Sequence, residues 1–246
     1  MHIWDIWYRI ALHLDGFAMR YFYFTEVCEM ANKTKRLTES AMLLAVAIVL
    51  ELLSKMIIPE MPFGGQVTLV SMLPVVLISY RHGVRWGLAA GFAYALLEMA
   101  IGGKTVAAAF QPGYFGDGVQ LLNAAVMCLL DYLVAFTVLG IGGCFRNRCK
   151  KPGTGLMLGS LVALGARYLA HIASGYLLFA GWAEWFFTQE GFPQWGAALV
   201  ERLSPQALGL VYSVVYNGFY MVPEILLTAA ASLLLTRIPN TVRKIS

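Results

Sequence analysis

Long apolar stretches recur along almost the whole chain, and they constrain the fold more than any other feature. A helix needs about 20 mostly apolar residues to cross the hydrocarbon core of a bilayer. The stretches that approach this length are residues 38–58, 67–80, 86–102, 119–143, 155–181 and 207–236. Only 13% of the residues are charged, whereas soluble domains carry about 25%. The sequence therefore predicts an all-α integral membrane protein, a bundle of six transmembrane helices embedded in lipid.

The second stretch differs from the others because it is short and contains helix-breaking residues. Gly64 and Gly65 precede it, and Pro74 interrupts it. In transporters, short or Gly/Pro-interrupted segments often line the substrate site. We therefore expect this region to lie close to a ligand.

The basic residues predict the orientation of the chain. They concentrate in alternate connections, at Lys33, Lys35, Arg36, Arg81, Arg85, Arg146, Arg148, Lys150, Lys151, Arg237, Arg243 and Lys244. Loops rich in Lys and Arg remain on the cytoplasmic side of a membrane. We therefore expect a multi-pass protein of the plasma membrane with both termini in the cytoplasm. The same distribution explains the net charge of +4, so the charge gives no indication of nucleic-acid binding.

The chain divides into an N-terminal cytoplasmic segment, residues 1–36, and a membrane domain, residues 37–246. Residues 1–29 contain aromatic side chains but no long apolar run, and they lack the ordered pattern of a signal peptide. Met30 begins a compact basic segment that leads directly into the first apolar stretch. Our hypothesis is that Met30 is the initiator and residues 1–29 are an extension of the gene model. The alternative is a weakly amphipathic surface helix.

No motif in the sequence predicts a cofactor, a metal site or ATP hydrolysis. The sequence G-G-K-T at 102–105 resembles the end of a phosphate-binding loop, but the position of the first glycine is Glu98. The four cysteines lack the spacing of a zinc site. We therefore expect no cofactor.

Charged residues within the apolar stretches need an explanation, because each costs about 2.5–3.5 kcal/mol at the centre of a bilayer. They are Glu51, Glu98, Asp131, Arg167, His171 and Glu224. Glu51 and Glu98 lie near the external ends of their stretches, where extension of the side chain towards water is a sufficient explanation. Arg167 and His171 are four residues apart and share one helical face.

Two interpretations of Asp131 remain open. It forms either an internal ion pair with Arg167 or part of a binding pocket. The pocket is favoured because polar and aromatic residues lie at the same depth: Tyr132, Tyr168, Tyr176, Tyr212, Tyr216 and Asn217. These groups suit a small, flat, cationic ligand, since aromatic faces attract cations and an amide both donates and accepts hydrogen bonds.

Several motifs resemble the thiamine-specific S components of energy-coupling factor (ECF) transporters. They are L-T-E-S-A-M-L-L-A (37–45), P-F-G-G-Q-V-T-L-V-S-M-L-P (62–74), L-D-Y-L-V-A-F-T-V-L-G (130–140), A-R-Y-L-A-H-I-A-S-G (166–175) and Y-S-V-V-Y-N-G (212–218). The resemblance implies a six-helix fold with a vitamin site near the external face. It also implies assembly with a transmembrane coupling subunit and two ATPase subunits.

The resemblance extends to individual residues. It implies that Asp131 occupies the position of an acidic ligand-binding residue, commonly glutamate, and that the loop with Gly64, Gly65 and Gln66 covers the site. The full set of expected ligand-binding residues is Gly65, Gln66, Asp131, Tyr132, His171, Phe179, Trp182, Tyr212, Tyr216 and Asn217.

Two further features of the sequence bear on the ligand and on the partner subunits. Some members have a stacking tryptophan where this chain has Phe179, so either Phe179 or Trp182 would stack on the ligand. Ala41 and Ala45 form the A-x-x-x-A motif that contacts the coupling subunit in the family, with ordinary packing or lipid contact as the alternative.

Together these features predict a non-enzymatic, high-affinity thiamine-binding subunit. The alternatives are the same fold binding a precursor such as a hydroxymethylpyrimidine, an intramembrane enzyme that uses Asp131 and His171, and a facilitator that works without ATPase partners.

Overall fold

The protein is described by a computed structural model, which covers residues 30, 32–61, 65–115, 119–190 and 192–238. In this part of the chain the regular elements are helices, and five helical stretches are long and apolar enough to cross a membrane. These stretches are Asn32–Ile57, Val84–Ile101, Gln120–Phe145, Pro152–Phe187 and Pro205–Leu235. The predicted all-α membrane fold is therefore confirmed.

The chain forms two compact units, Met1–Met42 and Leu43–Ser246. In the first unit, the described residues from 32 onwards are helical and belong to the stretch Asn32–Ile57. Residues 1–29, for which we expect an extension of the gene model, lie outside the described residues. The predicted division at residues 36 and 37 remains a prediction.

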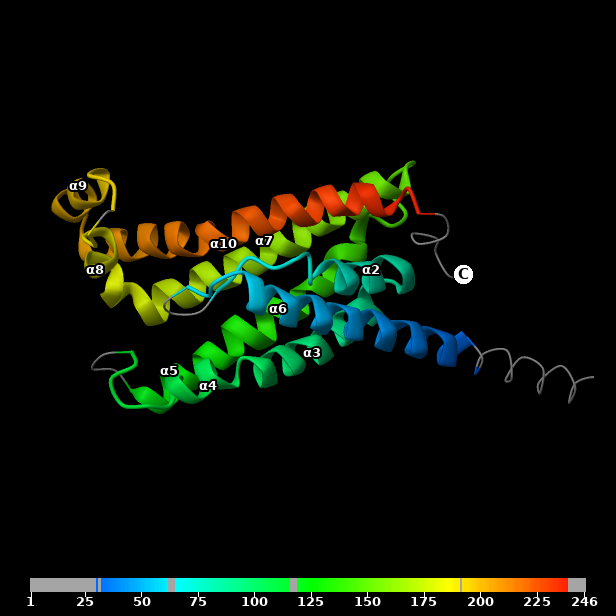
Figure 1. The fold of residues 1–246 in the computed structure, drawn as a ribbon, viewed down its shortest axis with the longest axis horizontal. Helices are drawn as coiled ribbons and strands as arrows, with labels where there is room; N and C mark the ends of the chain where they lie inside the picture. The colour runs from blue at the N-terminus through cyan, green and yellow to red at the C-terminus, as the bar shows by residue number, and fades with distance from the viewer. Residues whose placement is uncertain (1–29, 31, 62–64, 116–118, 191, 239–246) are drawn as a thin grey trace, which may run out of the picture. The chain divides into compact units, whose positions relative to one another are not determined.

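The second unit contains the remaining helices (Figure 1). In chain order they are α2 (Leu73–His82), α3 (Val84–Ile101), α4 (Gly103–Ala109), α5 (Gln120–Met127), η1 (Cys128–Val134), α6 (Ala135–Thr137), η2 (Val138–Phe145), α7 (Pro152–Phe179), η3 (Ala180–Trp182), α8 (Ala183–Phe187), α9 (Trp195–Arg202) and α10 (Pro205–Leu235). Pro152 and Pro205 are the first residues of α7 and α10. An N–H group at this position has no acceptor within the helix, so proline, which lacks the N–H, costs no hydrogen bond there. Ser204 caps α10 by accepting a hydrogen bond from the Ala207 N–H.

The helices α7 and α10 lie side by side along their length (Figure 1). Their contact is made by small and polar side chains: the hydroxyls of Ser160 and Ser232 are 2.9 Å apart, and Ser213 Oγ donates to the Ile172 carbonyl at 2.7 Å. Because lipid is as apolar as leucine, close packing and interhelical hydrogen bonds hold membrane helices together. Gly175 permits this approach, since a Cβ there would lie 2.3 Å from Ser213 Oγ.

Glycines also bring α2, α3 and η2 together. A Cβ on Gly140 would lie 2.3 Å from the Leu88 amide nitrogen, so the η2 and α3 backbones touch at this point. Ser79 of α2 joins the same contact: its hydroxyl donates to the Gly140 carbonyl and accepts from the Gly143 N–H. No larger residue fits at this crossing without moving a helix.

The predicted second span, residues 67–80, is helical only in its second half. The ten residues of α2 extend over about 15 Å, whereas the hydrocarbon core is about 30 Å thick. The segment between Gly65 and Met72 that precedes α2 is mostly non-helical, and it includes Val70 in the left-handed region with φ of 62°. Within the described residues, five helices are therefore long and apolar enough to cross a membrane, whereas the sequence predicts six.

Burial explains how the chain tolerates this irregular segment. Nine of the ten α2 residues are buried, and the preceding residues bond to the first long helix. The Gln66 side chain donates to the Ser54 and Ile58 carbonyls, and Ser54 Oγ accepts from the Leu69 N–H at 2.7 Å. Non-helical backbone at membrane depth is tolerated where protein groups satisfy its hydrogen bonds.

The close approach of α7 and η2 gives a testable prediction. A Cβ on Gly159 would lie 1.9 Å from the Gly142 carbonyl oxygen, whereas a Cβ on Gly165, in the same helix, meets nothing within 4 Å. We expect Gly159→Ala to lower the free energy of unfolding by about 1–3 kcal/mol, as overpacking does. Gly165→Ala should be neutral or slightly stabilising, because alanine favours the helix. Thermal unfolding in detergent measures both, and equal midpoints for the two variants would contradict the packing described.

Candidate ligand-binding site

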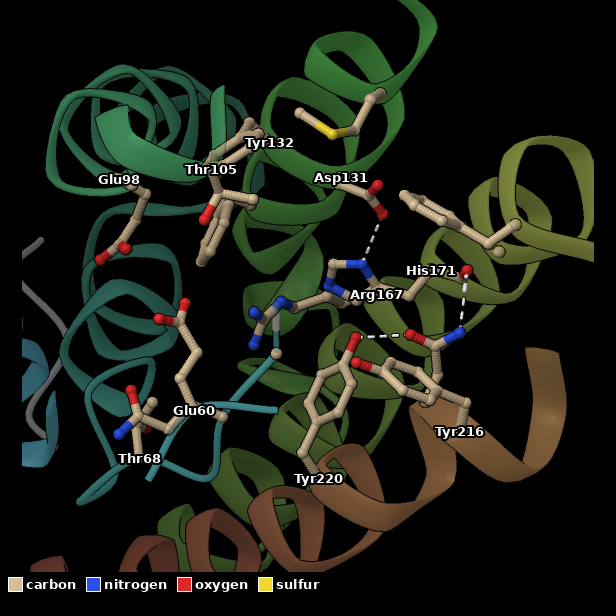
Figure 2. Close-up of a pocket in the computed structure, with 18 of the residues that line it drawn as sticks. Glu60, Thr68, Glu98, Thr105, Asp131, Tyr132, Arg167, His171, Tyr216 and Tyr220 are labelled. Atoms are coloured by element: carbon tan, nitrogen blue, oxygen red, sulfur yellow. Dashed lines mark hydrogen bonds and ion pairs between the residues drawn. The ribbon is translucent and has the colours of Figure 1, made fainter. Parts of the chain in front are cut away.

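A cavity of about 130 Å³ opens within the second unit, between α3, η1, α7, α10 and the segment that precedes α2 (Figure 2). Its lining combines carboxylates, cations, amides and aromatic rings. The residues that line it are Glu51, Lys55, Glu60, Gly65, Gln66, Thr68, Glu98, Gly102, Thr105, Met127, Asp131, Tyr132, Phe136, Arg167, His171, Gly175, Phe179, Tyr212, Tyr216, Asn217 and Tyr220.

The cavity brings together nine of the ten residues that the sequence predicts for ligand binding. These are Gly65, Gln66, Asp131, Tyr132, His171, Phe179, Tyr212, Tyr216 and Asn217. Trp182 does not line the cavity; its ring packs edge-on against Trp185 at 6.0 Å. Of the two candidates for stacking on a ligand, only Phe179 therefore faces the cavity. Gly64, expected in the covering loop, lies outside the described residues.

Asp131 lies in η1, a π-helical segment between α5 and α6. Such segments widen the helix locally and are frequent at functional sites. One carboxylate oxygen is 2.8 Å from His171 Nδ1, and the other accepts a hydrogen bond from Ser174 Oγ at 2.6 Å. Asp131 thus joins η1 to α7 and fixes the orientation of the imidazole.

The proposed ion pair between Asp131 and Arg167 is absent from the described residues. Instead, the Arg167 guanidinium lies 4.4 Å from the centre of the Phe136 ring and contacts Met72 Sδ. This arrangement is a cation–π contact of a buried guanidinium. The alternative of an ion pair between Asp131 and Arg167 was wrong, because His171, one turn further along α7, is the partner of Asp131.

His171 and Asn217 form the centre of a hydrogen-bonded network on the α7–α10 side. Asn217 Nδ2 donates to the Ser213 carbonyl at 2.8 Å and to the His171 carbonyl at 3.2 Å, and its Oδ1 accepts from the Tyr220 hydroxyl at 2.6 Å. Figure 2 shows the His171 ring held between Asp131 and this network. His171 Nε2 is buried and has no hydrogen-bond partner among the described residues, so it is available to a ligand.

Aromatic side chains form one wall of the cavity. Tyr212 and Tyr216 lie one turn apart on α10, and their ring centres are 5.5 Å apart. Phe115 and Tyr114, from the connection after α4, pack against Phe179 at 5.4 and 6.2 Å. Burial raises the pKa of the Tyr114 hydroxyl, and the nearby Asp131 and Glu60 carboxylates contribute to the same shift.

At Gly65 the backbone lies close to an aromatic ring that lines the cavity. It has φ of 90°, in the left-handed region, and a Cβ there would lie 2.5 Å from the Tyr220 ring. Only glycine fits both conditions. The chain therefore approaches the cavity through its backbone at Gly65, as the position of this residue in the sequence suggests.

The expectation that Glu51 and Glu98 extend towards water was wrong. Their exposed fractions are 6% and 4%, and both line the cavity. Sequence reasoning located these residues only approximately, because the position along a span does not reveal which helices face it. The sequence-based prediction also missed other residues that line the cavity, among them Thr68, Phe136, Arg167 and Tyr220. For Glu51, Glu98 and Arg167 the available signal was their charge at membrane depth.

Glu224 secures the irregular segment beneath the cavity. Its fully buried carboxylate accepts from the Thr68 N–H at 2.6 Å and from Thr68 Oγ1 at 2.8 Å. Ser71 Oγ lies 2.9 Å from both Thr68 Oγ1 and Glu51 Oε2. This chain of hydrogen bonds connects α10 with the first long helix through the segment between them.

The fold and the cavity define a class of protein. Several membrane-spanning helices enclose a polar and aromatic cavity, and the described residues contain no group of three or more His, Cys, Asp or Glu side chains placed to hold a metal ion. Such an architecture belongs to multi-pass membrane proteins that bind small organic molecules, among them transporters.

Comparison with known proteins specifies the family. The sequence model of the thiamine transporter protein family (Thia_YuaJ) matches residues 37–243, and the chain belongs to this family. Thiamine transporter ThiT of Bacillus subtilis (strain 168) is 34% identical over 209 residues, which cover 81% of this chain and 89% of that protein. The resemblance inferred from the sequence motifs is thereby confirmed.

A solved structure supports the fold. The structure of ThiT from Listeria monocytogenes matches with a TM-score of 0.55 over 86% of this chain and 98% of that chain. The sequence identity is 22%, so this similarity concerns the arrangement of the helices.

The Glu224–Thr68 contact gives a second prediction. Glu224→Gln replaces one acceptor oxygen by a donor, so one Thr68 donor loses its partner, and the free energy of unfolding should fall by about 1–3 kcal/mol. Thr68→Ser keeps both donors and serves as the matched control, with a change below about 1 kcal/mol. Hydrogen exchange followed by mass spectrometry should show faster exchange in residues 65–72 of Glu224→Gln alone. Unchanged exchange there would show that the contact does not hold the segment.

Proposed function

We propose that this protein binds thiamine in the cavity and acts as the substrate-binding S component of an ECF transporter. The observation that carries this proposal is the Asp131–His171–Ser174 cluster, because Asp131 and His171 line the same cavity as the aromatic side chains of Phe179, Tyr212 and Tyr216. Membership of the thiamine transporter protein family supports the same ligand.

The chemistry of the cavity suits the two rings of thiamine. The positively charged thiazolium would be stabilised by the Asp131 carboxylate and by aromatic faces. The aminopyrimidine would form hydrogen bonds with polar groups such as His171 Nε2, for which the described part of the chain provides no partner. The segment with Gly65 and Gln66 would cover the bound ligand, because it borders the cavity and is not part of a helix.

The proposed partners are a transmembrane coupling subunit and two ATPase subunits. The chain carries no nucleotide-binding motif, so uptake against a gradient would require ATP hydrolysis by other subunits. Ala41 and Ala45 are exposed on the helix Asn32–Ile57 and would form the contact with the coupling subunit. The distribution of Lys and Arg places both termini in the cytoplasm if the segment Gly65–His82 also crosses the membrane.

Thiamine binding is tested by quenching of intrinsic tryptophan fluorescence in the purified protein. Asp131→Asn removes the negative charge and should weaken binding by about 10- to 100-fold, the value of a charge-assisted contact. His171→Ala should weaken it to a similar extent. Leu226→Ala, on the exposed face of α10, is the control and should bind like the unaltered protein.

Each other outcome points to a different function. Binding of a hydroxymethylpyrimidine but not of thiamine would replace the ligand and keep the site. Conversion of bound thiamine into a product would indicate an enzyme. No binding of either compound would refute the proposal.

The proposed partner contact has a separate prediction. Leucine at Ala41 and Ala45 would separate two closely packed helices, so the double variant should lose thiamine uptake in cells that express the partner subunits. Thiamine binding by the purified variant should be unchanged. Val49→Leu, at an exposed position of the same helix, is the control. Uptake that is independent of the ATPase subunits would instead identify a facilitator.

A further inference from the structure

Phe186, on α8, forms a cluster of three aromatic rings with two tyrosines of α10. Its ring centre lies 5.2 Å from that of Tyr212 and 5.7 Å from that of Tyr216, and the two tyrosine ring centres are 5.5 Å apart. Phe186 meets both tyrosine rings edge-on, with interplanar angles of 71° and 68°. Ring pairs in this geometry attract one another beyond the effect of the area that they bury.

The three rings differ in their relation to the ligand cavity. Tyr212 and Tyr216 line it and are only 1% and 6% exposed, whereas Phe186 is half-buried and lies outside the lining. Phe186 therefore contacts both tyrosine rings without belonging to the surface that a ligand would meet. Side chains that contact a ligand keep their binding orientation when neighbouring groups fix their rotamers.

The helix that carries Phe186 is itself held by aromatic packing. α8 has only five residues, and α9 packs against it at one end of the α7–α10 pair (Figure 1). The Phe187 ring, 1% exposed, lies 5.5 Å from the Phe192 ring and 5.9 Å from the Trp195 ring. A Cβ on Gly196, in α9, would lie 2.5 Å from the Phe187 carbonyl oxygen. Because α9 leaves α8 so little room, α8 presents Phe186 to α10 in a defined position.

We propose that Phe186 is a positioning residue for the ligand: it holds Tyr212 and Tyr216 in the orientation that receives thiamine, without touching thiamine itself. The inference rests on the proposed thiamine binding, and it adds the α8–α9 connection to the elements that determine affinity. Without the Phe186 ring, the two tyrosine side chains gain rotamer freedom. A ligand then has to order them on binding, and this ordering lowers its affinity.

The first experiment measures thiamine affinity of the purified protein by titration calorimetry. Phe186→Ala should weaken binding by about tenfold, the cost of ordering two side chains on binding. Phe186→Leu keeps much of the bulk but not the ring, so its loss should be smaller, about threefold. Unaltered affinity in Phe186→Ala would overturn the proposal.

Phe219→Leu is the matched control. The Phe219 ring also contacts Phe186, at 6.4 Å, but Phe219 is 54% exposed and lies outside the cavity lining. Its replacement removes an aromatic ring from the same cluster and leaves the contacts of Phe186 with the two tyrosines in place. Thiamine affinity should therefore stay within about twofold of that of the unaltered protein. A loss equal to that of Phe186→Ala would show that any disturbance of this cluster weakens binding, and would refute a specific role of Phe186.

The second experiment asks whether Phe186 acts through the tyrosines. Effects of residues that act through one another are not additive, whereas independent effects are. In a Tyr216→Leu background only Tyr212 remains for Phe186 to hold, so Phe186→Ala should weaken binding by about threefold instead of about tenfold. A tenfold loss in both backgrounds would identify a general effect on the structure and refute the positioning role. If Tyr216→Leu binds too weakly to measure, near-UV circular dichroism of the ligand-free protein decides: Phe186→Ala should change the tyrosine signal, and an unchanged signal would refute the role.

The outcomes separate this inference from the proposed function. Absence of thiamine binding by the unaltered protein would refute the function and the inference together. Thiamine binding with unaltered affinity in Phe186→Ala would leave the function intact and refute the role of Phe186 alone. If Phe186→Ala does not fold, as judged by size-exclusion chromatography, Phe186→Leu takes its place, and unaltered affinity in that variant would refute the role.

Discussion

A buried charge or unpaired polar group inside a membrane costs several kcal/mol, and the arrangement around the cavity follows from this constraint. Hydrogen bonds with His171 and Ser174 offset this cost for the Asp131 carboxylate. The cation–π contact with the Phe136 ring offsets part of it for the Arg167 guanidinium. Glu224 binds the backbone and hydroxyl of Thr68. Each of these contacts joins segments that are distant along the chain, and Asp131, Arg167 and Thr68 also line the cavity, so groups that a ligand would meet also hold the bundle together.

The same constraint explains the irregular segment between Gly65 and Met72. Its free backbone groups would be unstable against lipid, but Glu224 of α10 accepts from the Thr68 N–H, and Ser54 of the first long helix accepts from the Leu69 N–H. A segment held by a few hydrogen bonds can rearrange at lower cost than a continuous helix can. The segment borders the cavity, and the proposed covering of a ligand would depend on such a rearrangement. The glycine that faces Tyr220 allows this approach without a side chain in between.

The sequence by itself determined the membrane environment, the helical class, the family and nine residues of the cavity lining, because apolar length and local motifs are properties of contiguous residues. It placed Asp131 and His171 at the site, but it left open whether Asp131 pairs with Arg167. Only the tertiary structure decided that pairing, the burial of Glu51 and Glu98, and the shortening of the second span to α2. These outcomes depend on how the helices pack against one another. Residues 98, 131, 167 and 224 lie on four different helical segments, and the relative rotation of those segments is set by packing between surfaces that are distant along the chain.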